Sequence, residues 1–434
     1  MKKLLHTLFF FFLATQICFG QWYPQNSGTT KHLNKVQFVD ANTGWAVGDS
    51  GLILYTSNGG ADWTQQASGT HHNLLAVCFK GNNTGWAAGG TGEFWNPDSA
   101  IIISTTDGGL NWVQQVSIKG NFYDLCFINE NVAYVVGYGE NSSGQIKPII
   151  TKTTNCGLSW SHNFPDLDVS SIYSIKFAES NIGWIIGLRG NIQGAYSIIT
   201  KTTDNGATWF EQDTLSGKAK VSCFDTNFAV AVSEAPAFGW IGEITKTANG
   251  GIDWITVVSE PDWNYYDLSI ISSEIITVVG VKWGQGRILR STDSGQSWTN
   301  QNIDSVPPLN GVSFIDDNIG WVVGDNGGIL HKTNGGVTFI DNEPTQPTDF
   351  ILEQNFPNPF NPSTTISWQS PVGSYQTIKV FDVLGNEIAT LIDEYKPAGR
   401  YEVEFNAERL ASGTYFYQLK AGEYTSVKKM ILIK

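Results

Sequence analysis

The sequence TTDGGLNW, at residues 105–112, is one of a series of related eight-residue segments that decides the fold of this chain. The six complete copies begin with Thr or Ser and end with Trp, and a seventh, degraded copy ends with Phe. The other copies are residues 56–63, 153–160, 202–209, 247–254, 291–298 and 332–339. Their final aromatic residues lie 41–49 residues apart, which is the length of a four-stranded propeller blade.

A second motif, of the form Gly-Trp-x-x-Gly, recurs once for each copy of the eight-residue segment. Its copies, some of them degraded, are residues 44–48, 85–89, 132–137, 183–187, 228–232, 275–280 and 320–324. Because each motif occurs seven times, we predict an all-β, seven-bladed β-propeller over residues 21–340. No segment shows a sustained 3.6-residue apolar period, so we expect almost no helix.

The chemistry of the eight-residue segment predicts a structural turn. Its hydroxyl and its Asp or Asn side chain can bond backbone amides, its Gly supplies positive φ, and its Trp covers the gap between blades. The segment resembles the Asp box, or BNR repeat, of sialidases and related propellers, with Asp at Asp107, Asp204 and Asp293. We interpret these three aspartates as structural and not catalytic.

The segment WYPQNSGT at residues 22–29 mirrors WTQQASGT at residues 63–70, which follows the first complete turn. It therefore reads as an outer strand that has no blade of its own before it. An unpaired edge is a liability, so we expect it to join the seventh blade and close the ring. Residues 337–340 compete for the same position.

Across residues 22–340 the arrangement is similar to the photosystem II assembly and stability factor family of seven-bladed propellers. In that family the plant and cyanobacterial proteins chaperone a membrane subunit and use a basic patch. The propeller here has only Arg189, Arg287 and Arg290. The resemblance therefore implies the fold, but that activity is not carried over.

The first 20 residues predict a signal peptide that directs export to the periplasm. Lys2 and Lys3 precede a short apolar run, and Cys18-Phe19-Gly20 follows it. That run is too short to span a bilayer, and no other segment approaches the necessary length. Removal of residues 1–20 leaves 24 basic and 40 acidic residues. Such an acidic chain repels phosphate backbones, so we expect no nucleic-acid partner and no membrane span.

Three of the four remaining cysteines, Cys78, Cys126 and Cys223, each precede a Phe at one equivalent place in different repeats. They should point the same way from different blades, so we expect free, buried thiols although export permits disulfides.

Both repeated motifs stop after the seventh repeat, and the composition of the sequence changes there. Residues 341–349 are polar and contain proline, as a linker does. Residues 350–434 carry alternating apolar and polar stretches at 366–368, 378–381, 401–405, 415–420 and 428–434. We predict a small antiparallel, immunoglobulin-like β-sandwich there.

This C-terminal part resembles the type A C-terminal sorting domain of the Bacteroidetes type IX secretion system; the alternative is a generic immunoglobulin-like module. The matching residues include Pro357, Asn358, Pro359, Phe360, Gly385, Gly399 and Gly413. The resemblance implies that the outer-membrane translocon binds residues 350–434 and that a sortase-like peptidase cuts near the linker. The propeller would then be secreted or attached to the outer cell surface.

The loops that vary in length all fall on the propeller face opposite the Asp boxes, where loops are free to vary. We predict a face that binds a glycan or a protein. Its candidate residues are Trp95, Tyr138, Glu140, Arg189, Trp240, Trp263, Trp283 and Arg287. The alternative is that these side chains merely cover the ends of the blades.

The sequence predicts no catalytic residue, metal site or cofactor. Acidic residues on the loop face leave a polysaccharide hydrolase or lyase as an alternative, since a glycosidase needs two carboxylates roughly 5–9 Å apart. Those residues are Glu93, Asp98, Glu140, Glu234, Glu243 and Asp262. A third hypothesis is an assembly factor for a cell-envelope complex. We expect a monomer.

Overall fold

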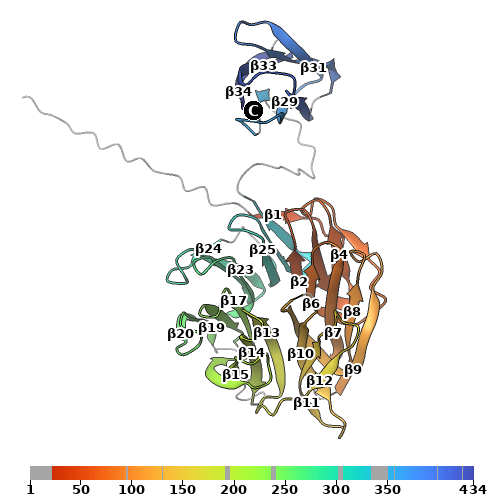
Figure 1. Cartoon of the computed structure of the whole chain (residues 1–434), viewed down its shortest axis with the longest axis vertical. Coiled ribbons are helices and arrows are strands. Elements are labelled where there is room, and N and C mark those ends of the chain that lie inside the picture. Colours follow the sequence, from red (N-terminus) through yellow and green to blue (C-terminus); the bar gives the residue numbers. More distant parts are fainter. Residues whose placement is uncertain are drawn as a thin grey trace, which may run out of the picture. The chain divides into compact units, whose positions relative to one another are not determined.

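The computed structural model describes two compact units, Met1–Thr338 and Phe339–Lys434 (Figure 1). The described residues are 22–93, 96–129, 131–190, 196–235, 241–301, 306–333, 350–355, 357–397, 399–422 and 424–434. The predicted signal peptide and linker lie outside them. The first unit is built of seven four-stranded blades in the described residues, as the two motifs predict.

Each of blades 1–3 is an antiparallel meander. Their strands are β2 (Leu33–Phe38), β3 (Gly44–Gly48), β4 (Ile53–Thr56), β5 (Thr64–Gln66), β6 (Asn73–Lys80), β7 (Thr84–Glu93), β8 (Asn96–Thr105), β9 (Val113–Phe127), β10 (Ala133–Glu140), β11 (Ile146–Thr153) and β12 (Ser161–Asn163). The long strand β9 serves two blades. Its first half pairs with β8 and its second half pairs with β10, so blades 2 and 3 form one continuous sheet.

Blades 4–7 follow the same plan. Their strands are β13 (Ser171–Phe177), β14 (Gly183–Arg189), β15 (Tyr196–Thr202), β16 (Phe210–Ser216), β17 (Ala219–Cys223), β18 (Ala229–Ser233), β19 (Ile241–Thr247), β20 (Ile255–Pro261), β21 (Asn264–Ile270), β22 (Ile276–Lys282), β23 (Gln285–Ser291), β24 (Thr299–Asn300), β25 (Leu309–Phe314), β26 (Gly320–Gly324) and β27 (Ile329–Lys332). The only helical elements among the described residues are two 3-10 turns, η1 (Asp49–Gly51) and η2 (Asp325–Gly327), at equivalent places in blades 1 and 7.

Strand β1 (Trp22–Gln25) closes the ring. It pairs with β27, with Trp22 opposite Lys332 and Gln25 opposite Ile329, and so becomes the outer strand of blade 7. In Figure 1 the red β1 lies beside the cyan strands of that blade. The N-terminal strand therefore closes the ring as expected, whereas residues 337–340 lie outside the described part of the chain.

The inner strands of successive blades contact one another around the whole ring, from β2 to β6, β9, β13, β17, β21 and β25 and back to β2. Aromatic side chains fill each gap farther out. Trp45 of blade 1 stacks on Phe79 of blade 2 at 3.5 Å between ring centroids, and Trp112 packs edge-on against Phe79 at 5.7 Å. Trp321 of blade 7 repeats this contact on Phe38 of blade 1. Each blade is thus attached to the next by a buried aromatic group.

None of the cysteines among the described residues forms a disulfide. Cys126 is buried, Cys78 and Cys223 are half-buried, and Cys156 is exposed within the Asp-box turn of blade 3. The expectation of thiols without disulfides is confirmed, but only Cys126 is fully buried.

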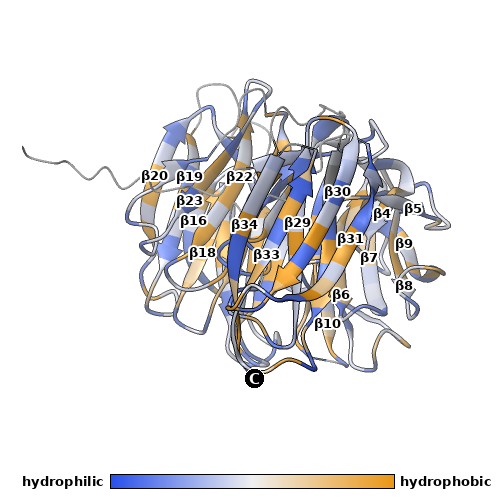
Figure 2. Cartoon of the chain, turned by 90° about the horizontal axis from the view of Figure 1, so that it is seen from above, coloured by the Kyte–Doolittle hydropathy of each residue, from blue (hydrophilic) through white to orange (hydrophobic). Residues whose placement is uncertain are grey.

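The second unit is a sandwich of two sheets. One sheet contains β28 (Ile351–Leu352), β29 (Ser363–Ser370) and β32 (Gly399–Asn406), and the other contains β31 (Glu387–Lys396), β30 (Ser374–Phe381), β33 (Gly413–Ala421) and β34 (Tyr424–Leu432). Buried and accessible residues alternate along β29 and β33, in step with the hydropathy pattern (Figure 2). Sequence patterning missed β28, which is very short, and β31, which lacks regular alternation.

We expect Trp22→Ala to lower the free energy of unfolding of the propeller by about 3–5 kcal/mol, since Trp22 is only 2% exposed and packs edge-on against Phe314. Denaturant titration followed by circular dichroism measures this. Pro24→Ala, an exposed change in the same strand, should stay within about 0.5 kcal/mol of wild type. Equal stability of the two variants would contradict the role of β1 in closure.

Candidate functional site

The Asp boxes are closed by their own side chains. In blade 2, Asp107 Oδ1 accepts hydrogen bonds from Thr105 Oγ1 at 2.7 Å and from the backbone amide of Asn111 at 2.9 Å. The amide of Gly109 donates to Thr105 Oγ1 at 2.9 Å. The boxes of Asp204 and Asp293 repeat this pattern. All three carboxylates therefore accept their hydrogen bonds from groups within the turn.

The residue after each Asp or Asn of the boxes has positive φ, whether it is Gly108, Cys156, Asn205 or Ser294. This geometry turns its carbonyl toward the preceding blade. The indole Nε1 of Trp45 donates to Gly108 O at 3.3 Å, and Tyr134 Oη donates to Asn205 O at 2.8 Å. The box thus joins blades as well as closing a turn.

Hydrogen bonds to the carboxylate set the pKa values of the box aspartates. The Asn111 side chain and amide lower the pKa of Asp107 to about 2. The Thr208 hydroxyl and amide do the same for Asp204, and those of Ser297 do so for Asp293. Such groups are held ionised, which suits a structural role.

The structure distributes the predicted binding residues over several blades. Trp95 and Trp240 lie outside the described residues. Tyr138 is fully buried, with its ring 5.9 Å from Tyr123. Tyr138 therefore belongs to the core and not to an exposed binding surface, because its place on β10 turns the side chain inward.

Two charged candidates make local ion pairs. Glu140, at the end of β10, forms an ion pair with Lys119, in which Nζ lies 2.7 Å from Oε2. Arg189, at the end of β14, donates from Nε to the backbone oxygen of Asp168 at 2.7 Å and also pairs with Glu211. Both side chains lie on different blades from Trp263, and neither is among the described side chains that contact it.

The other three candidates, Trp263, Trp283 and Arg287, come together on blade 6. With Glu260, Tyr265 and Lys282 they form what we call the blade 6 cluster. The Arg287 guanidinium lies 4.4 Å from the Trp263 ring centroid and pairs with Glu260. Tyr265 Oη donates to Glu260 Oε2 at 2.8 Å. Arg287 is thereby held in place by protein partners, which fixes the orientation of Trp263.

Trp283 is the exposed member of the blade 6 cluster. It occupies the tip of the β22–β23 hairpin at φ 52°, and its side chain is 72% exposed. Lys282 Nζ lies 4.7 Å from its ring centroid and donates to Pro261 O at 2.9 Å. An exposed indole beside an ammonium group offers a flat apolar face and a hydrogen-bond donor.

Sequence reasoning did not assign Glu260 and Lys282 to this site. The signal for Lys282 was its adjacency to Trp283. A half-buried Arg287 also calls for a carboxylate partner, but only the tertiary structure shows that Glu260 supplies it.

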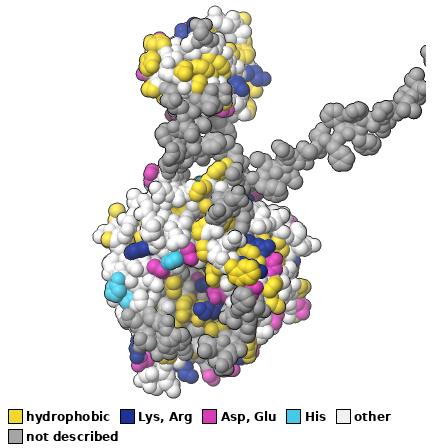
Figure 3. All heavy atoms as spheres, turned by 180° about the vertical axis from the view of Figure 1, so that it is seen from behind, with side chains coloured by type: hydrophobic (Ala, Val, Ile, Leu, Met, Phe, Trp, Pro, Cys, Tyr) yellow, Lys and Arg dark blue, Asp and Glu magenta, His cyan; other side chains and the backbone are white. Residues whose placement is uncertain are grey.

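The other loop-face carboxylates show no catalytic arrangement among the described side chains. Glu243 Oε2 accepts from the Ser216 amide at 3.0 Å and from its hydroxyl at 3.1 Å. Burial raises the pKa of Glu234, with Lys218 opposing that effect. The side chains of Glu93 and Asp98 lie outside the description. Figure 3 shows acidic and basic side chains interspersed on the propeller face that it presents.

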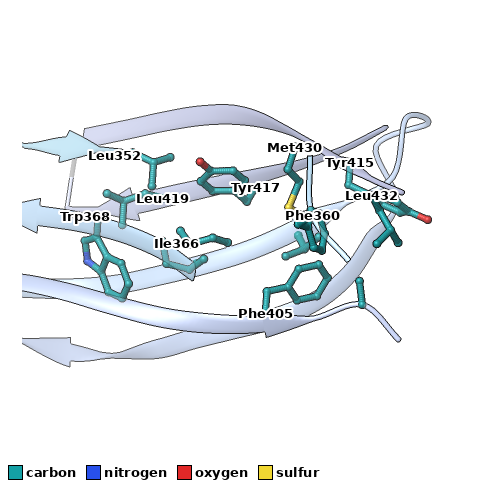
Figure 4. Packing of buried hydrophobic residues seen from close by; sticks show 14 residues of the cluster. Leu352, Phe360, Ile366, Trp368, Phe405, Tyr415, Tyr417, Leu419, Met430 and Leu432 are labelled. Carbon is teal, nitrogen blue, oxygen red and sulfur yellow. The ribbon is translucent and has the colours of Figure 1, made fainter. Parts of the chain in front are cut away.

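The sorting motif is attached to the C-terminal strand. Asn358 Oδ1 accepts the amide of Ile431 at 2.9 Å, and the Phe360 amide donates to Ile431 O at 2.9 Å. Phe360 is 2% exposed in the sandwich core, near Met430 and Leu432 (Figure 4). Gly385 takes φ 85° in a turn, while Gly399 and Gly413 begin β32 and β33.

Comparison with known families supports both parts of this architecture. Residues 354–434 match the secretion system C-terminal sorting domain, and residues 14–114 match the photosynthesis system II assembly factor YCF48. Both resemblances drawn from the sequence are confirmed. No match was found among curated proteins.

Several solved structures share the propeller fold. YCF48 bound to D1 peptide is 18% identical with a TM-score of 0.55, covering 73% of this chain and 96% of that one. YCF48 from Cyanidioschyzon merolae is 20% identical with a TM-score of 0.54, covering 73% and 100%. The GH74 xyloglucanase from Xanthomonas campestris is 11% identical with a TM-score of 0.57, covering 81% and 59%. At these identities the likeness shows the fold alone.

The chain is therefore an all-β propeller protein with a C-terminal secretion sorting domain, which supports its export to the cell surface or the medium. Within the described ranges, no helix is long and apolar enough to cross a membrane, and no group of three or more metal-binding side chains comes together.

Acid should weaken the propeller through its box aspartates. Their pKa of about 2 lies below the ordinary value of 3.8, so their stabilisation is present above about pH 4 and is lost as the pH falls toward 2. We expect the triple variant Asp107→Asn, Asp204→Asn, Asp293→Asn to show a smaller drop in Tm over this range. Asn already occupies this place at Asn58, Asn155 and Asn249, so the variant should fold.

Differential scanning fluorimetry between pH 2 and pH 5 measures the effect. Asp166→Asn, an exposed change outside the boxes, is the matched control and should follow wild type. If the triple variant also follows wild type, the box carboxylates do not carry the acid sensitivity.

Proposed function

We propose that this protein is a non-enzymatic binding propeller, exported through the type IX system by residues 350–434 and displayed on the cell surface or released. Its binding surface is the blade 6 cluster, and its ligand is a glycan. The observation that carries the proposal is the 72% exposed indole of Trp283 beside Lys282, on a surface braced by Arg287 and Glu260.

The chemistry of the cluster suits a sugar. The apolar face of a pyranose stacks on an indole, and ring hydroxyls hydrogen-bond to charged groups beside it. Lys282 Nζ lies 6.0 Å from the ring centroid of Trp263 as well as close to Trp283. One ammonium group therefore lies near both indoles. A rigid aromatic surface loses little conformational entropy when it binds.

Two rival functions have weaker support. A hydrolase needs an acid and a second carboxylate, but Glu260 in the cluster is neutralised by Arg287, and the xyloglucanase likeness concerns the fold. A peptide is the second candidate ligand, because one similar structure is of YCF48 bound to D1 peptide. That ligand would also favour the assembly-factor hypothesis.

A glycan array probed with the purified propeller tests the main proposal. We expect defined glycan hits, and we expect Trp283→Ala to weaken binding about tenfold or more, a loss of ~1.4 kcal/mol, by removing the stacking surface. Phe210→Ala is the matched control, since Phe210 is 59% exposed on an outer strand of blade 4, away from the cluster.

Retained binding by Trp283→Ala would place the ligand elsewhere. Shortened products from the bound glycan would favour the hydrolase, and an empty array together with capture of a peptide would favour a protein ligand.

Export has its own test. A chain that ends before residue 350 should keep its signal peptide function but accumulate in the periplasm of a type IX-competent bacterium, as cell fractionation and immunoblotting would show. A reporter fused to residues 350–434 behind the same signal peptide should reach the outer surface. Surface delivery of the truncated chain would contradict the assignment of the sorting signal.

A further inference from the structure

A cavity of about 190 Å³ lies at the centre of the propeller. All seven inner strands line it, and none of the blade 6 cluster does. A volume of this size exceeds the ~30 Å³ that one water occupies in the liquid, so it has room for several waters or a small solute.

The ionisable groups that line this cavity are unequal in number, and burial lowers the pKa of one of them, Lys220. Three lysines, Lys35, Lys176 and Lys220, face two aspartates, Asp124 and Asp267. The whole chain carries a net charge of −14, so an excess of basic over acidic residues at its axis runs against the overall composition.

Both carboxylates are already engaged by protein donors. Asp267 accepts from Lys35 Nζ at 2.7 Å and 2.8 Å and from the amide of Val312 at 2.9 Å. Asp124 accepts from Ser174 Oγ at 2.9 Å and from the amide of Ile175 at 3.1 Å.

Of the three lysines, two have direct protein partners. Lys35 pairs with Asp267, and Lys220 Nζ donates to the backbone oxygens of Tyr123 and Tyr173 at 3.1 Å and 2.8 Å. Lys176 Nζ makes no hydrogen bond or ion pair with any residue that the structure describes. A half-buried ammonium group without an acceptor calls for a ligand or water.

The neighbouring thiols do not supply the missing negative charge. Burial raises the pKa of Cys78 to about 11 and that of Cys223 to about 12, so both stay protonated at neutral pH. Burial opposes the charge of Lys176, but Asp124 and its neighbours outweigh that effect and raise the pKa of Lys176. Lys176 is therefore a cation.

Serine hydroxyls from other blades complete the lining. Ser222, Ser269 and Ser313 come from blades 5, 6 and 7, and Lys176 comes from blade 4. Ser313 Oγ accepts from the amide of Phe38 at 3.1 Å, which leaves its proton available to donate. Donors that surround an axis suit a compact anion with oxygens in several directions better than a planar carboxylate.

We propose that the central cavity binds a small tetrahedral oxyanion of the phosphate or sulfate class, with Lys176 as its principal cation. This site lies on the propeller axis and is independent of the glycan surface.

Thermal unfolding of the full chain with phosphate or sulfate, at constant ionic strength, tests the site. When the anion concentration rises from Kd to one hundred times Kd, the folded-to-unfolded ratio should increase about fiftyfold. This increase is measured as a rise in Tm. Lys176→Met should remove this specific rise. Lys147→Met, at an exposed lysine of β11, should retain it.

The readout is the dependence of Tm on anion concentration, so a change in baseline stability of Lys176→Met does not affect the conclusion. Sulfate also stabilises proteins by exclusion from their surface, and that part should be equal in all variants. An equal dependence in wild type and Lys176→Met would overturn the proposal. Acetate acting as strongly as phosphate would overturn the tetrahedral class.

A second measurement does not depend on variant folding. In crystals of the wild-type chain soaked with selenate, the anomalous signal of selenium should lie in the cavity beside Lys176. Absence of that signal from the cavity would also overturn the proposal.

Discussion

The propeller depends on a contact that recurs between blades, in which an aromatic side chain of the second strand of one blade donates to a carbonyl in the Asp box of the next blade. At the closing point, Trp321 stacks on Phe38 with ring centroids 3.4 Å apart and donates to Gly59 O at 3.0 Å. Gln25 of β1 donates to the same oxygen at 2.8 Å. The same pair of hydrogen bonds joins blades 1 and 2, where Gln66 Nε2 and Trp45 Nε1 both donate to Gly108 O. The last blade is thus attached to the first in the same way as blade 1 is attached to blade 2.

This contact survives changes in the residues that make it, because the accepting carbonyl stays in place. Tyr134 replaces Trp in blade 3 and donates through its hydroxyl. In blades 4 and 5 the donor is a lysine of the third strand, β15 or β19. Lys201 Nζ donates to Gly250 O, and Lys246 Nζ donates to Ser294 O, each at 2.5 Å. Positive φ after the box Asp or Asn is what presents the carbonyl, so the backbone geometry matters more than the donor.

Because the closed ring holds the blades in place, the loops on its two faces and the side chains at its axis are available for binding. The blade 6 cluster sits on hairpins whose strands are fixed by the ring, so the exposed Trp283 is held at a defined place. The axis gathers one inner strand from each blade and brings together Lys35, Lys176, Lys220, Asp124 and Asp267, which are far apart in the sequence. The sorting domain folds around a core of its own, in which Phe360 and the C-terminal strand meet.

The sequence by itself determined the blade number, the closing strand and the sorting domain, because these rest on local turn chemistry and on short motifs repeated at a fixed spacing. It also grouped Trp263, Trp283 and Arg287 on one face. Only the tertiary structure decided that Tyr138 is buried, that Glu260 neutralises Arg287, and that Lys176 lies in a central cavity. These depend on which inner or loop residues meet across blades, and a repeat pattern specifies the blade but not its neighbours' side chains.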